Sequence, residues 1–240
     1  MRQAIEFGGA KVLSLPFIEI KALNDLQAIQ DLEDKVLQLD CYQSLIFVSN
    51  NAVRFGGEVI NNYWPQVPLS VNVIAVGPTT AEAASERFIC EVTQPSNGMT
   101  SEDILRLPQL QDVSGQKIGI VRGQGGRELL ADTLRERGAI VDYLEAYSRS
   151  PIDYTSADFC NRLCEAGVNV LTVSSGESLD RLTHLLADDR KKLQQFNLLV
   201  PSQRVGRQAE KAGYQKVHNA SGADPLSFVS ALGELGINQE

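Results

Sequence analysis

The sequence predicts an α/β protein built from two similar parallel-sheet domains, which are joined by a two-stranded hinge with a cleft between them. Three observations predict this class. Strand-like and helix-like runs alternate through nearly all of the 240 residues, one pattern of segments occurs twice, and 43% of the residues are apolar, which is enough to fill two cores. Alternating elements of this kind form parallel sheets that helices cover on both faces.

The first half of the chain shows the alternation clearly. Apolar residues 45–48 form a short run that ends in Ser49, and a helical pattern follows over 51–63. A second apolar run, 71–76, closes with Gly77-Pro78-Thr79-Thr80, where proline at a helix start and threonine as a cap suit a helix over 80–88. The elements expected next are a strand over 90–93, a helix from Ser101, a strand over 117–122, a helix over 126–137 and a strand over 140–147.

The same alternation resumes in the second half. The expected elements are a strand over 170–174, a helix from Gly176, a strand over 198–200, a helix from Ser202, a strand over 216–218 and a helix over 225–235. Three segments of the first half recur here in the same order. They are LIFVS at 45–49 with LTVSS at 171–175, AVGPT at 75–79 with LLVPS at 198–202, and GAKV at 9–12 with GAIV at 138–141. Matches at nearly one spacing indicate two copies of one α/β unit.

The repeat also predicts that the two domains are interleaved. Residues 11–21 match the end of the copy that contains 117–150, so we expect a discontinuous first domain of 1–21 plus 152–240 and a second domain of 22–151. The chain would cross between them near 19–23 and 149–154. Two adjacent crossings make a hinge about which the domains rotate, and a hinge between two α/β units makes a ligand cleft.

The start of the first copy is shorter than the start of the second. Gly138-Ala139 follows a strand and a helix over 117–137, whereas the matching Gly9-Ala10 follows only residues 1–8. We therefore expect the first domain to lack its first strand. Its sheet, which would contain 11–20, should have one strand fewer than the sheet of 117–122.

Composition and charge exclude several classes of function. The net charge of −8 argues against nucleic acid as a partner, because that binding needs a basic face. No apolar run is long enough to span a bilayer and the first residues do not resemble a signal peptide, so we expect a cytoplasmic protein without a membrane partner. The cysteines and histidines are few and scattered, so we expect no metal site and no His-based catalysis; they are Cys41, Cys90, Cys160, Cys164, His184 and His218.

Small hydroxyl residues and glycines follow four of the expected strands, at points where a helix begins. They are Ser49 and Asn50, Gly77 with Thr79 and Thr80, Ser175 and Gly176, and Ser202. In open parallel sheets ligands bind outside the carboxyl ends of the strands, and such turns offer N–H groups and hydroxyls to carboxylates. Ordinary helix capping explains any one of these turns, but their recurrence in both copies favours substrate binding.

The expected strands over 117–122 and 140–147 end in further candidates. The glycine-rich turn after Arg122 resembles a dinucleotide loop only loosely, because Glu128 stands at the third glycine position. We expect Arg122 and Gly123 to hold an anionic side group instead, with Arg127 as a further donor. Tyr147 ends its strand beside the second crossing, where its phenol can face the cleft and give a proton; packing as a half-buried tyrosine is the alternative.

Taken in order, these segments resemble the uroporphyrinogen-III synthase family. The resemblance is carried by FVSNNAV at 47–53, VGPTTA at 76–81, GQGGRELL at 123–130, EAY at 145–147, TVSSGE at 172–177 and VPS at 200–202, and it covers nearly the whole chain. It implies two flavodoxin-like domains on a two-stranded connector. The family usually opens with a strand ending in Thr-Arg-Pro and then a helix, whereas this chain starts inside what resembles that helix.

The resemblance implies a cofactor-free lyase of tetrapyrrole biosynthesis. Such an enzyme converts the linear hydroxymethylbilane to uroporphyrinogen III, with inversion of ring D and loss of water. By position, Tyr147 matches the tyrosine proposed to assist departure of the hydroxyl, and Thr80, Ser175 and Ser202 match hydroxyls that line the cleft. We expect a monomer. Two alternatives stay open: a non-enzymatic two-lobed domain that binds small molecules, and a nucleotide enzyme.

Overall fold

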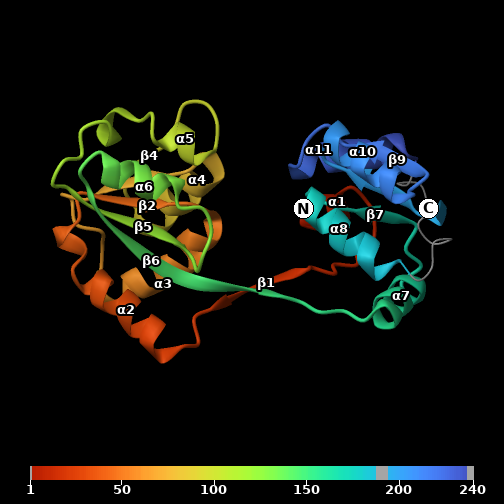
Figure 1. Cartoon of the computed structure of the whole chain (residues 1–240), viewed down its shortest axis with the longest axis horizontal. Coiled ribbons are helices and arrows are strands. Elements are labelled where there is room, and N and C mark those ends of the chain that lie inside the picture. Colours follow the sequence, from red (N-terminus) through yellow and green to blue (C-terminus); the bar gives the residue numbers. More distant parts are fainter. Residues whose placement is uncertain (1, 188–193, 237–240) are drawn as a thin grey trace. The chain divides into compact units, whose positions relative to one another are not determined.

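The computed structural model describes residues 2–187 and 194–236. The chain forms two compact units, one of Met1–Ile18 with Pro151–Glu240 and one of Glu19–Ser150. The colours of Figure 1 show that segments from the beginning and the end of the sequence share the first of these units. Within the described residues, no helix combines the length and the apolar character needed to cross a membrane.

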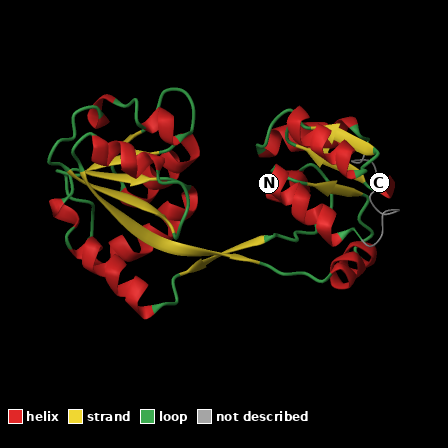
Figure 2. Ribbon diagram, in the orientation of Figure 1, coloured by secondary structure: helices red, strands yellow, loops and turns green. Residues whose placement is uncertain are grey.

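The unit of Glu19–Ser150 is built on a six-stranded sheet (Figure 2). Its elements are β1 Ile18–Ala22, α2 Leu26–Leu37, β2 Ser44–Phe47, α3 Asn50–Tyr63, β3 Asn72–Ala75, α4 Pro78–Phe88, β4 Val92–Thr93, α5 Ser101–Ile104, β5 Lys117–Gly123, α6 Leu129–Glu136 and β6 Ile140–Pro151. The strand order is β1-β6-β5-β2-β3-β4, and all pairs from β6 to β4 are parallel. Counted along the chain from β2, the five parallel strands have the doubly wound order 3-2-1-4-5. The 2-1-3-4-5 order of flavodoxin-like sheets results only when the count starts at β5 and continues from β6 to β2. The predicted α/β class is confirmed.

Side-chain alternation along the strands fills a core on each face of this sheet. On β2, Leu45 and Phe47 join the core of α2, α3 and α4, whereas Ile46 joins the core of α5 and α6. All four residues of β2 are buried. A continuous apolar run is what a parallel strand needs when helices cover both faces, which is why 45–48 carries no polar alternation.

The other unit holds a sheet of three described strands. Its elements are α1 Arg2–Phe7, α7 Ser156–Glu165, β7 Val170–Thr172, α8 Gly176–Leu185, β8 Asn197–Val200, α10 Gln203–Ala212, β9 Lys216–Asn219 and α11 Pro225–Glu234. The strand order is β7-β8-β9, and both pairs are parallel. Leu198 and Val200 of β8 join a core with α8 and α10, whereas Leu199 joins a core with Ile5 of α1 and Phe228 of α11.

The expectation for residues 11–20 is wrong. Residues 10–17 form no strand, and β1, which begins at Ile18, lies beside β6 in the six-stranded sheet. The two sheets therefore differ by more than one strand among the described residues. Ring packing and a single backbone hydrogen bond anchor Phe17 at the end of this segment: its ring stacks on Phe159 at 6.1 Å, and its carbonyl accepts the N–H of Ile152 at 3.0 Å.

Two element boundaries differ from the expected ones in ways that affect the site. The helix expected from 126 begins only at Leu129, because Gly125 and Gly126 have φ of 69° and 105°, which no helix accommodates. The strand expected to end at 147 continues to Pro151. Tyr147 therefore lies inside β6 and not at its end.

Candidate functional site

β5 and β2 are parallel neighbours in the six-stranded sheet, with Phe47 paired to Val121. The helix after β2 is α3, which packs on the face of Leu45 and Phe47, whereas the helix after β5 is α6, which packs on the face of Ile46. The chain thus leaves these two strands towards opposite faces. Ligands of open α/β sheets bind at such a switch point, outside the carboxyl ends of the strands. Ser49, Arg122 and Gly123 lie at this edge.

Ser49 caps α3 and contacts Tyr147 with the same oxygen. Its backbone is extended, with φ of −170°, and its Oγ accepts the N–H of Ala52 at 3.1 Å. That bond satisfies one of the N–H groups that a helix start leaves unpaired. The Oγ also lies 3.1 Å from the hydroxyl oxygen of Tyr147. Ser49 is half-buried, so it remains accessible at the edge of the sheet.

A β-bulge turns Tyr147 towards Ser49. Glu145 pairs with Arg122, but the next pair joins Tyr147 to Gly123, so Ala146 is an extra residue in β6. Simple alternation would send Tyr147 to the opposite face of the sheet. Because of the bulge, Tyr147 lies in the core of α3, where its ring centroid is 5.6 Å from that of Phe55.

Tyr147 is more buried than either sequence-based alternative, a phenol that faces the cleft or a half-buried packing residue. Its exposed fraction is 0%. Its hydroxyl has two partners, Ser49 Oγ at 3.1 Å and Arg149 Nη2 at 3.1 Å. Arg149 was not predicted from the sequence, because the strand was expected to end at Tyr147 but continues to Pro151. In a longer strand, a residue two positions further on shares the same face, and that signal would have found it.

Arg122 is buried, and its guanidinium is committed to the loop that follows β5. It donates to the carbonyl oxygens of Gly125 and, at 3.3 Å, of Arg127, and it lies 3.6 Å from a carboxylate oxygen of Glu128. These contacts hold the loop in place. Direct binding of a substrate group by Arg122 therefore stays a prediction.

A cavity of about 140 Å³ adjoins this loop, and Ser101, Gly123, Arg127 and Arg149 are among the residues that line it. Tyr143 also lines it, and the Arg122 guanidinium carbon is 4.6 Å from the centre of the Tyr143 ring. Two causes raise the pKa of Tyr143 above its ordinary value: burial, which is the larger, and a hydrogen bond to Glu128. Arg127 and Arg149 can therefore bind an anionic group in this cavity. Arg122 lines it too, but its guanidinium already bonds to the loop after β5.

The turns after β2 and β3 are joined by a hydrogen bond. Thr80 is buried and donates through Oγ1 to Oδ1 of Asn50 at 2.8 Å. Gly77 is the N-cap of α4, and a Cβ there would lie 2.6 Å from Cγ of Met99. Thr79 is exposed. Asn50, Gly77 and Thr80 therefore shape the edge through contacts within the protein, while Thr79 is free to meet solvent.

Two of the sequence-predicted hydroxyls cap helices of the other unit. Ser175 caps α8 and accepts the N–H of Ser178 at 3.1 Å, and Ser202 caps α10 and accepts the N–H of Val205 at 3.4 Å. Their strands, β7 and β8, are parallel neighbours, so both caps lie at one edge of the three-stranded sheet. Gln208, in the middle of α10, donates to the carbonyl of Gly176 at 3.5 Å, which joins α10 to the start of α8.

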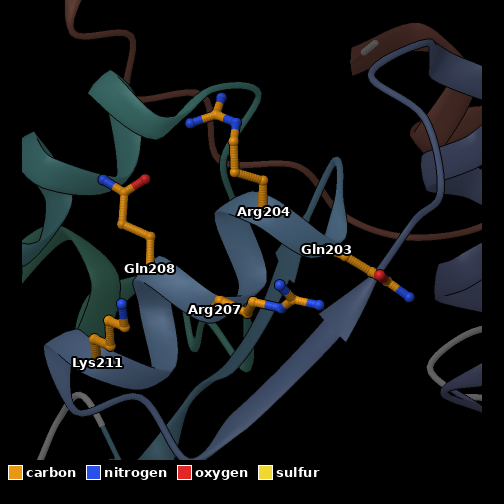
Figure 3. A pocket seen from close by; sticks show the side chains of 5 residues that line it. All are labelled: Gln203, Arg204, Arg207, Gln208 and Lys211. Atoms are coloured by element: carbon orange, nitrogen blue, oxygen red, sulfur yellow. The ribbon is translucent and has the colours of Figure 1, made fainter.

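A larger cavity, of about 570 Å³, lies over α10. It is lined by Gln203, Arg204, Arg207, Gln208 and Lys211. Figure 3 shows these five side chains spread over one side of the helix that Ser202 caps. Three cations and two amides on one helix face can bind carboxylates, which is notable in a chain of net charge −8.

The structure thus brings the predicted residues together in two groups. Ser49, Asn50, Thr80, Gly123 and Tyr147 gather at the switch point of the six-stranded sheet, and Ser175, Gly176 and Ser202 gather at the edge of the three-stranded sheet. Across residues 2–187 and 194–236, no three His, Cys, Asp or Glu side chains are placed to ligate a metal ion.

Comparison with known proteins gives one consistent family. The profile of the family described as "Uroporphyrinogen-III synthase HemD" matches residues 1–230. Uroporphyrinogen-III synthase of Salmonella typhimurium is 34% identical over 227 residues, which cover 93% of this chain and 91% of that protein. The enzyme of Escherichia coli is 34% identical over 211 residues, which cover 86% of this chain and 85% of that protein.

Solved structures agree on the fold. A mutant uroporphyrinogen III synthase from Thermus thermophilus matches with a TM-score of 0.55 and 16% identity, and the match covers 99% of this chain and 92% of that one. The synthetase from Helicobacter pylori matches with a TM-score of 0.56 and 14% identity, and the match covers 92% of both chains.

Proposed function

The chain belongs to the uroporphyrinogen-III synthase family, and from this premise we propose that it closes hydroxymethylbilane at the edge of Ser49 and Tyr147. The family activity is that of a hydro-lyase in tetrapyrrole biosynthesis. The proposal adds the substrate and the residues that act on it. Ring D is inverted during closure, and one water leaves.

The chemistry asks little of the protein beyond a proton and a fixed geometry. The pyrrole nitrogen next to the hydroxymethyl group can push out the hydroxide and carry the resulting positive charge. A positioned general acid speeds such a departure by about 10²–10⁴-fold. Restraint of the reacting end lowers the activation free energy by a further several kcal/mol. This restraint is needed because the free bilane closes without inversion of ring D.

The observation that carries the proposal is the hydrogen bond between Tyr147 and Ser49 at the switch point. The hydroxyl pair lies just beyond the carboxyl end of β2, next to the half-buried Val48, and open α/β sheets bind their ligands at this end of their strands. A hydroxyl can donate a proton to a leaving oxygen without any metal or imidazole.

The eight carboxylates of the substrate need donors, and we propose that α10 supplies part of them. Arg204, Arg207 and Lys211 line its cavity, and the N-terminus of the helix lies at Gln203. Anions near a helix N-terminus gain about 0.3–1 kcal/mol each, and arginine adds charge-assisted hydrogen bonds. Ser202 would contribute its hydroxyl at the same end.

We also expect the enzyme to act as a monomer in the cytoplasm. The basis is the composition: an acidic chain whose four cysteines are scattered, as suits a reducing compartment. Size-exclusion chromatography with light scattering tests the monomer.

The test of the function is incubation with enzymatically generated hydroxymethylbilane, followed by oxidation and separation of the type I and type III isomers. We expect type III with the protein and type I without it. Type I alone, with the bilane bound but not turned over, would identify a two-lobed binder and not an enzyme.

A further inference from the structure

The hydroxyl of Tyr147 is enclosed by the protein and has two hydrogen-bond partners. Its side chain has no exposed surface, Arg149 Nη2 lies at 3.1 Å and Ser49 Oγ lies at 3.1 Å. A guanidinium has donors and no acceptor. The tyrosine oxygen therefore accepts from Arg149, and its single proton is left for its other partner, Ser49.

The reverse arrangement between Ser49 and Tyr147 is disfavoured. If Ser49 donated to Tyr147, the phenol proton would have no acceptor in a fully buried position, because Arg149 cannot accept it. A buried donor without a partner is strongly disfavoured. The hydrogen bond therefore runs from Tyr147 to Ser49.

Ser49 Oγ then has both of its lone pairs occupied. One accepts the N–H of Ala52 at 3.1 Å and the other accepts the proton of Tyr147. The hydroxyl proton of Ser49 is directed away from these two partners, and Ser49 is half-buried where Tyr147 is fully buried. The proton that the edge of the sheet can present to a ligand is that of Ser49.

We propose that Arg149, Tyr147 and Ser49 form a directed proton chain whose outer end is the Ser49 hydroxyl, so that the substrate meets Ser49 and Tyr147 acts from behind it. This inference rests on the proposed function and changes the roles within it. Ser49 is the catalytic residue, and Tyr147 and Arg149 are positioning residues that act through it.

The step balances without any co-reactant. The C–O bond of the hydroxymethyl group breaks with its electron pair on oxygen, and the Ser49 proton joins that oxygen to give water. Ser49 takes the Tyr147 proton, and the phenolate lies beside the Arg149 guanidinium. Inversion of ring D then forms a C–C bond between the former hydroxymethyl carbon and the substituted carbon of ring D, and it breaks the C–C bond from that carbon to the neighbouring bridge carbon. The freed bridge carbon forms a C–C bond to the other, unsubstituted end of ring D. That end loses one proton, which returns along the chain to Tyr147. The net change is the loss of one water from the substrate.

The test compares Ser49→Gly, Ser49→Thr, Tyr147→Phe and the double variant Ser49→Gly/Tyr147→Phe in full-length protein. Glycine removes the hydroxyl but remains acceptable at an N-cap, and threonine restores both cap and proton. Thr155→Gly is the matched control, because Thr155 belongs to the other unit and caps α7 through the same side-chain contact, to Asp158 N at 3.1 Å. Melting curves confirm that each variant is folded.

We expect kcat for type III product to fall about 10- to 100-fold in both Ser49→Gly and Tyr147→Phe, at or below the low end of the range for one general acid, with little change in KM. The double variant should fall no further, because both changes interrupt one chain. Ser49→Thr should restore kcat, and the solvent deuterium isotope effect of the wild type should diminish in both single variants. Thr155→Gly should retain wild-type kcat.

Wild-type kcat in folded Ser49→Gly together with a loss in Tyr147→Phe would overturn the inference, since Tyr147 would then reach the substrate directly. Multiplicative losses in the double variant would also overturn it. Type III product from all variants at the wild-type rate would rule out the proton chain of Arg149, Tyr147 and Ser49, while the proposed function would still stand. Type I product alone from the wild type would remove the proposed function itself.

Discussion

Gly123 and the ring of Tyr147 are so close that position 123 has no room for a side chain. A Cβ built on Gly123 would lie 2.7 Å from Cζ of Tyr147, the ring carbon that bears the hydroxyl. The two residues face each other across β5 and β6, at the register shift that follows Arg122 and Glu145. Position 123 therefore sets where the Tyr147 hydroxyl lies.

Gly123→Ala should displace the ring of Tyr147 and lower activity. The ring is fully buried, so it cannot swing into solvent, and overpacking of this kind costs about 1–3 kcal/mol of unfolding free energy. We expect lower kcat and a lower melting temperature. Gly206→Ala is the control, because a Cβ there meets only Val200 and Val217 at 3.6 and 3.7 Å. Wild-type kcat in Gly123→Ala would show that the ring position does not matter.

The sequence predicted the repeated architecture for a simple reason. A parallel strand covered on both faces must be a short apolar run, and Ile46 with its neighbours on β2 shows such a run directly. Helix starts can also be predicted from hydroxyl residues, because such residues accept an N–H of the helix that follows. Ser49, Ser175 and Ser202 each do so.

The environment of Tyr147 could not be predicted from the sequence. The direction of its side chain depends on one extra residue in β6, which forms a bulge. The pattern of apolar residues in the sequence does not show where such a bulge occurs. The commitment of Arg122 to Gly125 and Arg127 depends on the loop conformation that positive φ at Gly125 and Gly126 allows. Residues 10–17 matched a strand of the other copy by sequence, yet pairing requires a neighbour that only the fold supplies.

Tyr147→Phe should leave the fold intact and slow turnover without abolishing it. The phenylalanine ring fills the same space beside Phe55, and the substrate itself provides most of the driving force for departure of the hydroxide. We expect kcat to fall by about 10- to 100-fold, at or below the low end for one general acid. Steady-state assays of type III product with circular dichroism measure both quantities. Unchanged kinetics in the folded variant would reduce Tyr147 to a packing residue.

The double variant Arg204→Gln/Arg207→Gln should weaken substrate binding and spare the chemical step. Both side chains line the cavity over α10, and exposed ion pairs are worth about 0.2–1 kcal/mol each, so KM should rise by about tenfold with kcat unchanged. Added salt should raise the wild-type KM more than that of the variant. Arg162→Gln on α7 is the control, because that side chain pairs with Asp158 at 3.1 Å. Equal KM values for all three proteins would exclude α10 from carboxylate binding.

Removal of metal ions should leave activity unchanged. Within the part of the chain that the structure describes, no three potential ligands lie together, and Ser49 and Tyr147 need no metal to deliver a proton. Dialysis against a chelator, followed by the isomer assay, measures this. Loss of type III product with recovery on adding back one divalent metal would contradict the prediction.

Ile89→Gly should stabilise the unit of Glu19–Ser150. Ile89 ends α4 in the left-handed region, with φ of 51° and ψ of 47°, and 92% of it is exposed. Left-handed backbone costs a residue with a Cβ about 1–2 kcal/mol, which exceeds the roughly 0.5–1 kcal/mol of extra chain entropy that glycine loses on folding. The expected gain in unfolding free energy is up to about 1 kcal/mol, or about 2–4 °C in Tm, measured by thermal unfolding.

Leu69→Gly is the matched control, because Leu69 is 99% exposed and does not have positive φ. Since that position gains nothing from conformational freedom, Leu69→Gly should be neutral or slightly destabilising, and equal behaviour of the two variants would mean that Ile89 carries no strain.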